Sequence, residues 1–191
     1  MSGLRFLKNF LKAPGTVGAI WPSSPHLARE MVKDVGLERA GAVVELGPGT
    51  GVFTPFILGS LGTGANFFAV ELNKELHDCF KSRLPGVKVY HEDAANLRAL
   101  LAAENLERVD TIVSGLPWAA FPPGLQDRLL DVVLSVLPEG GHFTTFAYLQ
   151  GLALPTGLRF RAALRRKFSE VRRSKVEWRN LPPAFCYRCR K

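Results

Sequence analysis

Cysteine is scarce in this sequence, with three residues among 191, at positions 79, 186 and 189. Three thiols cannot all pair, so a disulfide framework of the secreted type is excluded and we expect a reducing, cytoplasmic compartment. Cys186 and Cys189 have the spacing of a zinc-ligand pair, but no second Cys or His pair lies nearby, and on a strand the two side chains would face opposite ways. We therefore expect small buried thiols and no metal site.

Long hydrophobic runs are also absent. No run approaches the roughly 20 apolar residues that cross a bilayer, and the N-terminus lacks a continuous apolar stretch followed by a small-residue cleavage site. No repeat or low-complexity tract interrupts the chain. With 47% apolar and 22% charged residues the composition is that of a globular protein, and the length suits one compact domain.

Charge is plentiful but unevenly placed along the chain. The net charge of +8 divides into +4 for residues 1–33, −6 for residues 34–157 and +10 for residues 158–191. A mildly acidic middle with basic ends favours an anionic partner, either a nucleic acid or an anionic membrane surface. Composition alone does not choose between these two partners.

Short β-rich runs alternate with segments of helical periodicity, which is the pattern of a mostly parallel sheet covered by helices on both faces. The predicted strands are 42–46, 67–71, 87–91, 109–115 and 141–148, and the predicted helices are 53–61, 74–84, 95–104 and 124–137. Asn73 and Pro123 are expected helix starts, and Gly62 and Gly86 expected stops.

The order changes after residue 148. A basic helix over 158–167 precedes two extended runs, 170–179 and 184–190, which are joined at Pro182-Pro183. We expect these two runs to form a hairpin that adds an antiparallel edge to the sheet.

The first twelve residues form an amphipathic pattern. At about 1.5 Å per residue, a helix of this length can lie on a membrane but cannot span it. A helix that caps the core is the alternative, and the pattern favours a membrane-surface anchor over residues 4–12. On a helical projection Leu4, Phe6, Leu7, Phe10 and Leu11 share one side, and Arg5, Lys8, Asn9 and Lys12 share the other.

A glycine-rich turn follows the first predicted strand. Gly47, Gly49 and Gly51 lie between a strand and a helix, where absent Cβ atoms allow a tight turn and the close approach of a ligand. Glu45, just before the turn, would suit a ligand ammonium group. Glu71 ends the next strand, followed by Leu72, and its carboxylate is placed to accept hydrogen bonds from both ribose hydroxyls.

Two further segments end the third and fourth predicted strands. Asp93-Ala94 follows the third strand, where the Asp side chain is placed to bond an adenine amino group. The segment 114–118, Ser-Gly-Leu-Pro-Trp, ends the fourth. All these features fall at the carboxyl ends of parallel strands, the edge at which such sheets bind ligands.

Taken in order, these segments resemble the successive motifs of class I S-adenosylmethionine-dependent methyltransferases. The resemblance implies a Rossmann-like, doubly wound, seven-stranded and mostly parallel sheet with S-adenosylmethionine as cofactor. Residues 45–51, 71–72, 93–94 and Ser114 would bind that cofactor.

Two subfamilies are similar to this core. Ribosomal RNA adenine dimethylases carry an Asn-Leu-Pro-Tyr type motif after the fourth strand, whereas segment 114–118 has no Asn and ends in Trp118. Bacterial phospholipid N-methyltransferases, which convert phosphatidylethanolamine to phosphatidylcholine, resemble this chain over nearly its full length. That resemblance is carried by residues 6–10, 15–24, 44–51, 114–118 and 180–184.

The resemblance to the phospholipid N-methyltransferases implies an amine acceptor, and several side chains suit one. A primary amine, with a pKa of about 10.4, must lose a proton before it attacks a methyl group, and Tyr148 or a water is a candidate acceptor of that proton. Trp118 and Asn180 are the other catalytic candidates, and the alternatives are core packing and turn formation. Trp21, Trp118 and Tyr148 offer cation–π attraction to a methylated headgroup, and Arg159, Arg161, Arg179 and Arg188 are candidates for its phosphate.

The leading hypothesis is thus a phospholipid N-methyltransferase that sits peripherally on the inner face of the cell membrane and needs no nucleic acid. Residues 1–33 would form the membrane-docking helix and a lid, and residues 34–191 the methyltransferase domain. The alternatives are an adenine N6-methyltransferase of ribosomal RNA and a cofactor-binding adapter that remodels membranes without catalysis.

Overall fold

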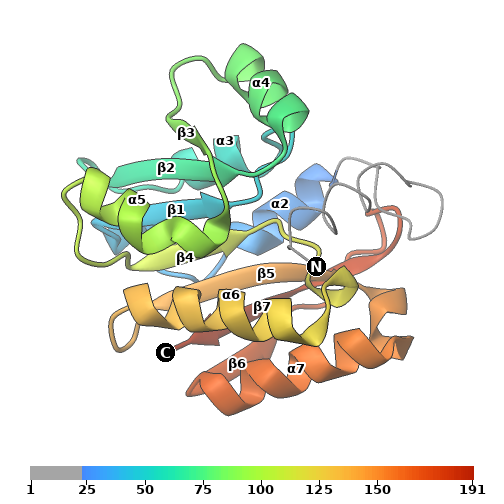
Figure 1. Cartoon of the computed structure of the whole chain (residues 1–191). Coiled ribbons are helices and arrows are strands. Elements are labelled where there is room, and N and C mark those ends of the chain that lie inside the picture. The colour runs from blue at the N-terminus through green and yellow to red at the C-terminus, as the bar shows by residue number, and fades with distance from the viewer. Residues whose placement is uncertain (1–22) are drawn as a thin grey trace.

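The computed structural model describes residues 23–191, so residues 4–12 and Trp21 lie outside the described residues. The strands are β1 (Ala42–Leu46), β2 (Asn66–Glu71), β3 (Val89–His91), β4 (Thr111–Ser114), β5 (His142–Tyr148), β6 (Glu170–Arg173) and β7 (Ala184–Arg190). They form one seven-stranded sheet in the order β3-β2-β1-β4-β5-β7-β6 (Figure 1). β7 is antiparallel to β5 and β6, and all other neighbours are parallel. The predicted fold is confirmed.

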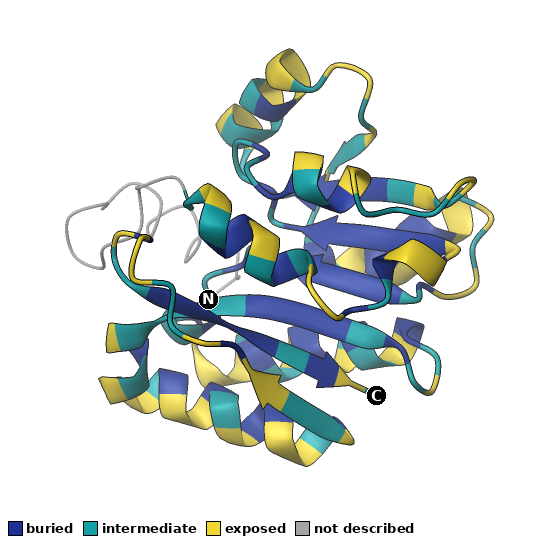
Figure 2. Cartoon of the chain, turned by 180° about the vertical axis from the view of Figure 1, so that it is seen from behind, coloured by how far each residue is buried: buried dark blue, intermediate teal, exposed yellow. Residues whose placement is uncertain are grey.

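Helices cover both faces of this sheet. The α-helices are α2 (Pro25–Val32), α3 (Thr54–Leu58), α4 (Lys74–Arg83), α5 (Leu97–Ala103), α6 (Pro123–Val136) and α7 (Pro155–Lys167). Short 3-10 helices are η1 (Leu37–Arg39), η2 (Ala94–Asn96), η3 (Trp118–Ala120) and η4 (Leu149–Ala153). The sheet lies between the helix layers and is mostly buried, while the helices expose their outer sides (Figure 2).

Two apolar clusters form the core, one on each face of the sheet. One contains Val44 of β1 and the buried sides of α5, α6 and α7, and the other contains Val43 and the buried sides of α2 and α3. Successive side chains of a strand point to opposite faces, so a run of apolar residues feeds both clusters. Cys186 and Cys189 also divide between the clusters, as their spacing on a strand predicts, whereas Cys79 is only half-buried.

The helix boundaries partly match the predicted ones. α4 begins after Asn73, whose side chain accepts a hydrogen bond from the Leu76 N–H at 2.9 Å, and α6 begins at Pro123, as expected. The stops at Gly62 and Gly86 are wrong. α3 ends at Leu58, followed by Gly59, and α4 ends at Arg83, so both helices finish before those glycines.

The first strand of the C-terminal hairpin is shorter than predicted. Arg173 pairs with Tyr187, but further along Glu177 pairs with Ala184, so β6 and the connection contain one more residue than β7 over this stretch. Such an extra residue is a bulge, which interrupts the ladder. β6 therefore ends at Arg173, and residues 174–183 form the connection between the two strands, called here the β6–β7 loop.

Helix α2 was not predicted as a separate element. Ser24 caps it by accepting the Leu27 N–H at 3.2 Å, and Pro25 occupies its first position. Leu27, Ala28 and Met31 are fully buried in the core. The described part of segment 1–33 is thus integrated into the methyltransferase body.

Candidate functional site

The site lies where the strand order reverses. β1 is followed in sequence by β2 on one side, while β4 flanks it on the other, so the carboxyl ends of these strands diverge and leave a crevice. A cavity occupies this position. It is lined by Gly47 from the glycine loop, Glu71 and Leu72 from the end of β2, Glu92, Asp93 and Ala94 after β3, and Leu116, Phe121, Leu125 and Leu129 from the β4–α6 region. The sequence-predicted residues from three strand ends are therefore brought together.

The glycine loop crosses the end of the sheet in a conformation that needs glycine. Gly49 has φ +58°, and a Cβ on it would meet no atom within 4 Å, so open space lies beside the loop at this point. Gly47 has φ +68°, and a Cβ there would lie 2.6 Å from Leu116 Cδ2. The loop thus approaches the β4 end closely and leaves room on its open side for a ligand.

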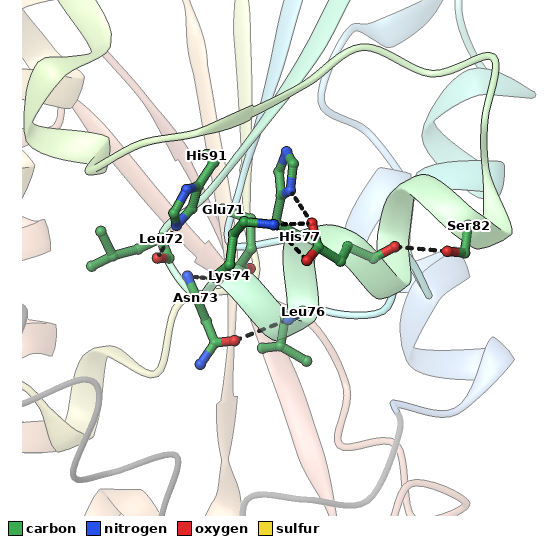
Figure 3. A network of polar contacts seen from close by, with 9 residues as sticks. Glu71, Leu72, Asn73, Lys74, Leu76, His77, Ser82 and His91 are labelled. Carbon is green, nitrogen blue, oxygen red and sulfur yellow. Dashed lines mark hydrogen bonds and ion pairs between the residues drawn. The ribbon is translucent and has the colours of Figure 1, made fainter.

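Glu71 connects this loop to the start of α4. Its Oε2 accepts the Gly49 N–H at 3.1 Å and its Oε1 accepts the Asn73 N–H at 2.8 Å. Figure 3 shows the second contact within the polar network at the start of α4, where His91 Nε2 also lies 3.1 Å from the Leu72 carbonyl. Burial raises the pKa of Glu71, and the backbone N–H donors partly oppose that rise. The carboxylate is fixed at the rim of the cavity.

Glu45 is fully buried beneath the loop. Its Oε2 accepts a hydrogen bond from the Thr54 hydroxyl at 2.7 Å, and burial raises its pKa to about 8. Within the described residues its Oε1 has no hydrogen-bond partner. A buried polar atom without a partner is costly, so Oε1 is an available acceptor for a cationic ligand group. Thr54 was missed in the sequence, although it stands at the first position of the helix that follows the loop.

Asp93 and Ala94 line the far side of the cavity. Asp93 Oδ1 accepts the Ala95 N–H at 2.9 Å and caps η2, while Oδ2 lies 3.7 Å from Arg128 Nη2. The carboxylate therefore remains partly exposed at the cavity wall, where the sequence predicted it.

Ser114 differs from the other predicted cofactor residues. Its side chain is fully buried, and its Oγ accepts hydrogen bonds from Trp118 Nε1 at 3.0 Å and from the Leu116 N–H at 3.3 Å. Ser114 is not among the residues that line the cavity. It shapes the segment after β4 and holds Trp118 in the core.

A second, strongly apolar cavity lies beside the ends of β4 and β5. It is lined mainly by η3, the last residues of β5, η4 and the start of α7, with Trp118, Tyr148, Phe160 and Tyr187 as its large side chains. Trp118 stacks on Phe160 at 4.8 Å between ring centroids. Tyr148 packs edge-on against Phe146, and burial raises the pKa of its phenol, so Tyr148 is protonated at neutral pH. A neutral phenol is a hydrogen-bonding group and a poor general base, which argues for a water in that role.

Asn180 is buried in the β6–β7 loop. Its Oδ1 accepts the Ser24 N–H at 2.8 Å, and its Nδ2 donates to the Pro182 carbonyl at 2.7 Å. The side chain ties the N-terminus of α2 to this loop, in agreement with the turn-forming alternative for this residue.

The four arginines considered for phosphate binding are not brought together. Arg159 of α7 pairs with Asp127 of α6, and Arg161 is half-buried on α7. Arg188 lies on the opposite, α2-facing side of the sheet, where its Nη2 donates at 2.7 Å to both the carbonyl and the Oε2 of Glu30. Arg179 is exposed in the β6–β7 loop, and a role in substrate binding stays a prediction for all four.

The fold and the glycine loop define the class of this protein as a Rossmann-like methyltransferase fold, and solved structures agree. An O-methyltransferase from Bacillus cereus in complex with SAH matches with a TM-score of 0.70 at 15% identity, over 98% of this chain and 91% of that one. TomG from Streptomyces achromogenes, in complex with SAM, matches with a TM-score of 0.67 at 13% identity, over 100% of this chain and 91% of that one. At these identities the likeness shows the fold.

Sequence comparison gives the family. No family model matches the chain. The ornithine lipid N-methyltransferase of Singulisphaera acidiphila is 33% identical over 188 residues, which is 97% of this chain and 94% of that protein. The ribosomal RNA small subunit methyltransferase A of Methylococcus capsulatus is 33% identical over 73% of this chain and 48% of that protein, so this chain spans about half of that relative. The chain belongs to the class I S-adenosylmethionine-dependent methyltransferases, in the family that includes the Singulisphaera protein, and its cofactor is S-adenosylmethionine.

Proposed function

We propose that this methyltransferase acts on the amine of a membrane lipid, and that phosphatidylethanolamine and its methylated intermediates are its substrates on the way to phosphatidylcholine. The observation that carries the lipid class is the similarity to a lipid N-methyltransferase over 97% of the chain. The apolar cavity beside Trp118 and Tyr148 supports it, because such a lining suits a lipid better than a polar base or nucleotide. Within residues 23–191, no helix has the length and apolarity to cross a bilayer, so the proposal places the protein on the membrane surface.

The residues at the cavity under the glycine loop fit the cofactor. Glu71 would hold the ribose hydroxyls, and Asp93 the adenine amino group, as the sequence motifs predicted. Glu45 Oε1 would accept from the ammonium of the methionine moiety, and this contact would give the buried oxygen its missing partner. The cofactor supplies a methyl group on a positively charged sulfur, which is a good electrophile for an amine.

The chain's own contribution to the reaction is to hold a neutral amine and exclude water. An apolar environment lowers the pKa of an amine by disfavouring the ammonium form, so more of the acceptor carries a free lone pair. The Tyr148 phenol would accept or donate one hydrogen bond to orient that nitrogen, and a water would carry the proton away. Each transfer leaves a more cationic headgroup, which aromatic faces such as that of Tyr148 attract.

Ornithine lipid is a second candidate substrate, favoured by the name of the Singulisphaera relative. An ornithine side chain also carries a primary amine, so the chemistry at the nitrogen is shared by both candidates. What differs is the headgroup, since only phosphatidylethanolamine brings a phosphodiester that needs cations.

The test is incubation of the protein with methyl-labelled cofactor and vesicles that contain one of the two lipids. Mono-, di- and trimethylated phosphatidylethanolamine are the expected products, and they should be absent with Glu71→Ala, which loses the acceptor for the ribose. Label in ornithine lipid alone would reject phosphatidylethanolamine as substrate. Label in ribosomal RNA with none in either lipid would reject the lipid class in favour of the RNA alternative. Vesicle remodelling with no label in any substrate would favour the non-catalytic adapter.

A further inference from the structure

Two large apolar side chains project from the β6–β7 loop. Trp178 is 70% exposed and Leu181 is 65% exposed, the highest values among the exposed large apolar residues within 23–191. The others are Leu58, Leu154 and Leu158, at 37–50%. A single exposed leucine needs no explanation, but a tryptophan and a leucine held out together on one short loop mark an interaction surface.

The loop is built to hold these side chains outward. Glu177 and Ala184 close its neck, with the Glu177 N–H donating to the Ala184 carbonyl at 2.7 Å. Inside the neck, Asn180 is buried and bonds the Pro182 carbonyl, which fixes the segment between Trp178 and Leu181. The exposure of the two side chains is therefore a consequence of an ordered turn whose polar groups point inward.

This loop lies at the ligand-binding edge of the sheet. The loop leads into Ala184, the partner of Tyr148 at the carboxyl end of β5, and the Leu149 N–H donates to the Pro183 carbonyl at 2.8 Å. Leu154 and Leu158, just before and within the start of α7, lie at the same end of the molecule (Figure 1). The exposed apolar side chains thus border the opening of the apolar cavity, which Leu154 also lines.

The chain preceding the described residues also starts here. The Ser24 N–H bonds Asn180 Oδ1, so residue 23 and the 22 residues before it leave the body of the protein beside the β6–β7 loop. Residues 4–12, whose sequence pattern favours a membrane-surface anchor, are therefore tethered next to Trp178 and Leu181.

The charges around the loop complement an anionic surface. Over residues 172–181 four cations, Arg172, Arg173, Lys175 and Arg179, stand against one acid, Glu177, and all four cations are exposed. Indole rings favour the headgroup region of a bilayer, aliphatic side chains favour its acyl boundary, and Lys or Arg near the surface adds about 1 kcal/mol each with anionic lipids.

We propose that the β6–β7 loop is a bilayer-insertion element, in which Trp178 and Leu181 enter the interface of an anionic membrane and Lys175 and Arg179 contact its phosphates. The element acts beside residues 4–12 and turns the cofactor-binding edge of the sheet toward the membrane. It rests on the proposed function for its biological use, since a lipid substrate is then presented directly at the apolar cavity.

The test compares the double variant Trp178→Ser/Leu181→Ser with the control Leu58→Ser, which removes an exposed leucine on α3. Each is sedimented with vesicles of phosphatidylethanolamine and phosphatidylglycerol. We expect the double variant to partition on the order of tenfold more weakly, because two apolar side chains no longer leave water, and the control to partition like the parent protein. Equal partitioning of the double variant and the parent would overturn the proposal.

Two further measurements separate this proposal from its neighbours. Methyl transfer to a short-chain phosphatidylethanolamine dissolved below its micellar concentration should be the same for the double variant and the parent, while transfer in vesicles falls. Absence of label in every lipid from the parent protein would contradict the proposed function and leave the partitioning result to decide the loop. If residues 1–22 cover the loop instead, the double variant should melt at a lower temperature with unchanged partitioning, and this result would also overturn the proposal.

Discussion

Glu45 is the residue whose chemistry depends most on the state of the site. Its carboxyl has a pKa of about 8 in the folded protein against an ordinary 4.5, because burial disfavours the charged form. The folded protein therefore keeps a proton between these two pH values that the unfolded chain has lost. The stability of the cofactor-free protein should fall as pH rises through that window, and Glu45→Gln should flatten this part of the profile.

Cofactor binding should reverse that penalty. If the ligand ammonium pairs with Glu45 Oε1, binding favours the carboxylate and releases a proton, so affinity rises with pH up to about 8 by at most roughly tenfold per unit. Above that pH the ammonium itself begins to lose its proton. Calorimetry of S-adenosylmethionine binding in buffers of different ionisation enthalpy measures the proton release. Release that persists unchanged in Glu45→Gln would show that another group is responsible.

Tyr148 poses a simpler question at the same scale. Burial raises the pKa of its phenol, so the phenolate is scarce at neutral pH. Tyr148→Phe should therefore lower the methylation rate through lost orientation of the acceptor, by about one hydrogen bond's worth or roughly tenfold, while the shape of the pH–rate profile stays the same. A profile that loses its basic limb in this variant would instead identify Tyr148 as the general base.

Among elements, the junction between α2 and the β6–β7 loop depends on Asn180. Asn180→Ala removes the acceptor for the Ser24 N–H and the donor to the Pro182 carbonyl in a buried setting, and should cost about 1–3 kcal/mol of unfolding free energy. Amide exchange in the first turn of α2 should accelerate with it. Asn66→Ala is a matched control, since Asn66 is exposed and makes only one long contact, at 3.4 Å to the Gly41 carbonyl. Equal destabilisation by both changes would mean that the junction adds nothing special.

The elements that the sequence predicts best are those whose patterns are strictly local. β1 and β7 have the predicted bounds because short β-rich runs flanked by turn residues leave little choice. The length of β6 was beyond such reasoning, because the bulge depends on its pairing with β7. α2 was missed even though Ser24 and Pro25 form a clear helix start, because attention fell on the amphipathic segment before it.

The same distinction holds for the site. The glycine loop, Glu71 and Asp93 were predictable because their positions at strand ends are set by the alternation of strands and helices. The role of Ser114 was not, since its bond to Trp118 arises from the turn between β4 and η3. The separation of Arg159 from Arg188 follows from the face of the sheet on which each lies, which composition does not reveal.

At the scale of the whole molecule, charge is concentrated where a membrane is proposed to dock. Residues 158–191 carry a net +10, whereas residues 34–157 carry −6. Methyl transfer to lipid in anionic vesicles should therefore fall severalfold as salt rises from about 0.05 to 0.5 M, because the Debye length shortens from above 10 Å to below it. Transfer to a dissolved short-chain lipid should change little. Equal salt sensitivity for both substrates would place the effect on the enzyme itself.

The position of β7 has a consequence for how the protein is made. The last strand in sequence is an interior strand of the sheet, between β5 and β6. During vectorial synthesis the ribosome releases residues 184–190 after all other strands, so β5 keeps an unpaired edge until they emerge. A nascent chain arrested before Ala184 exposes that edge together with the apolar side chains that Phe185 and Tyr187 would cover, and is a natural client for chaperones.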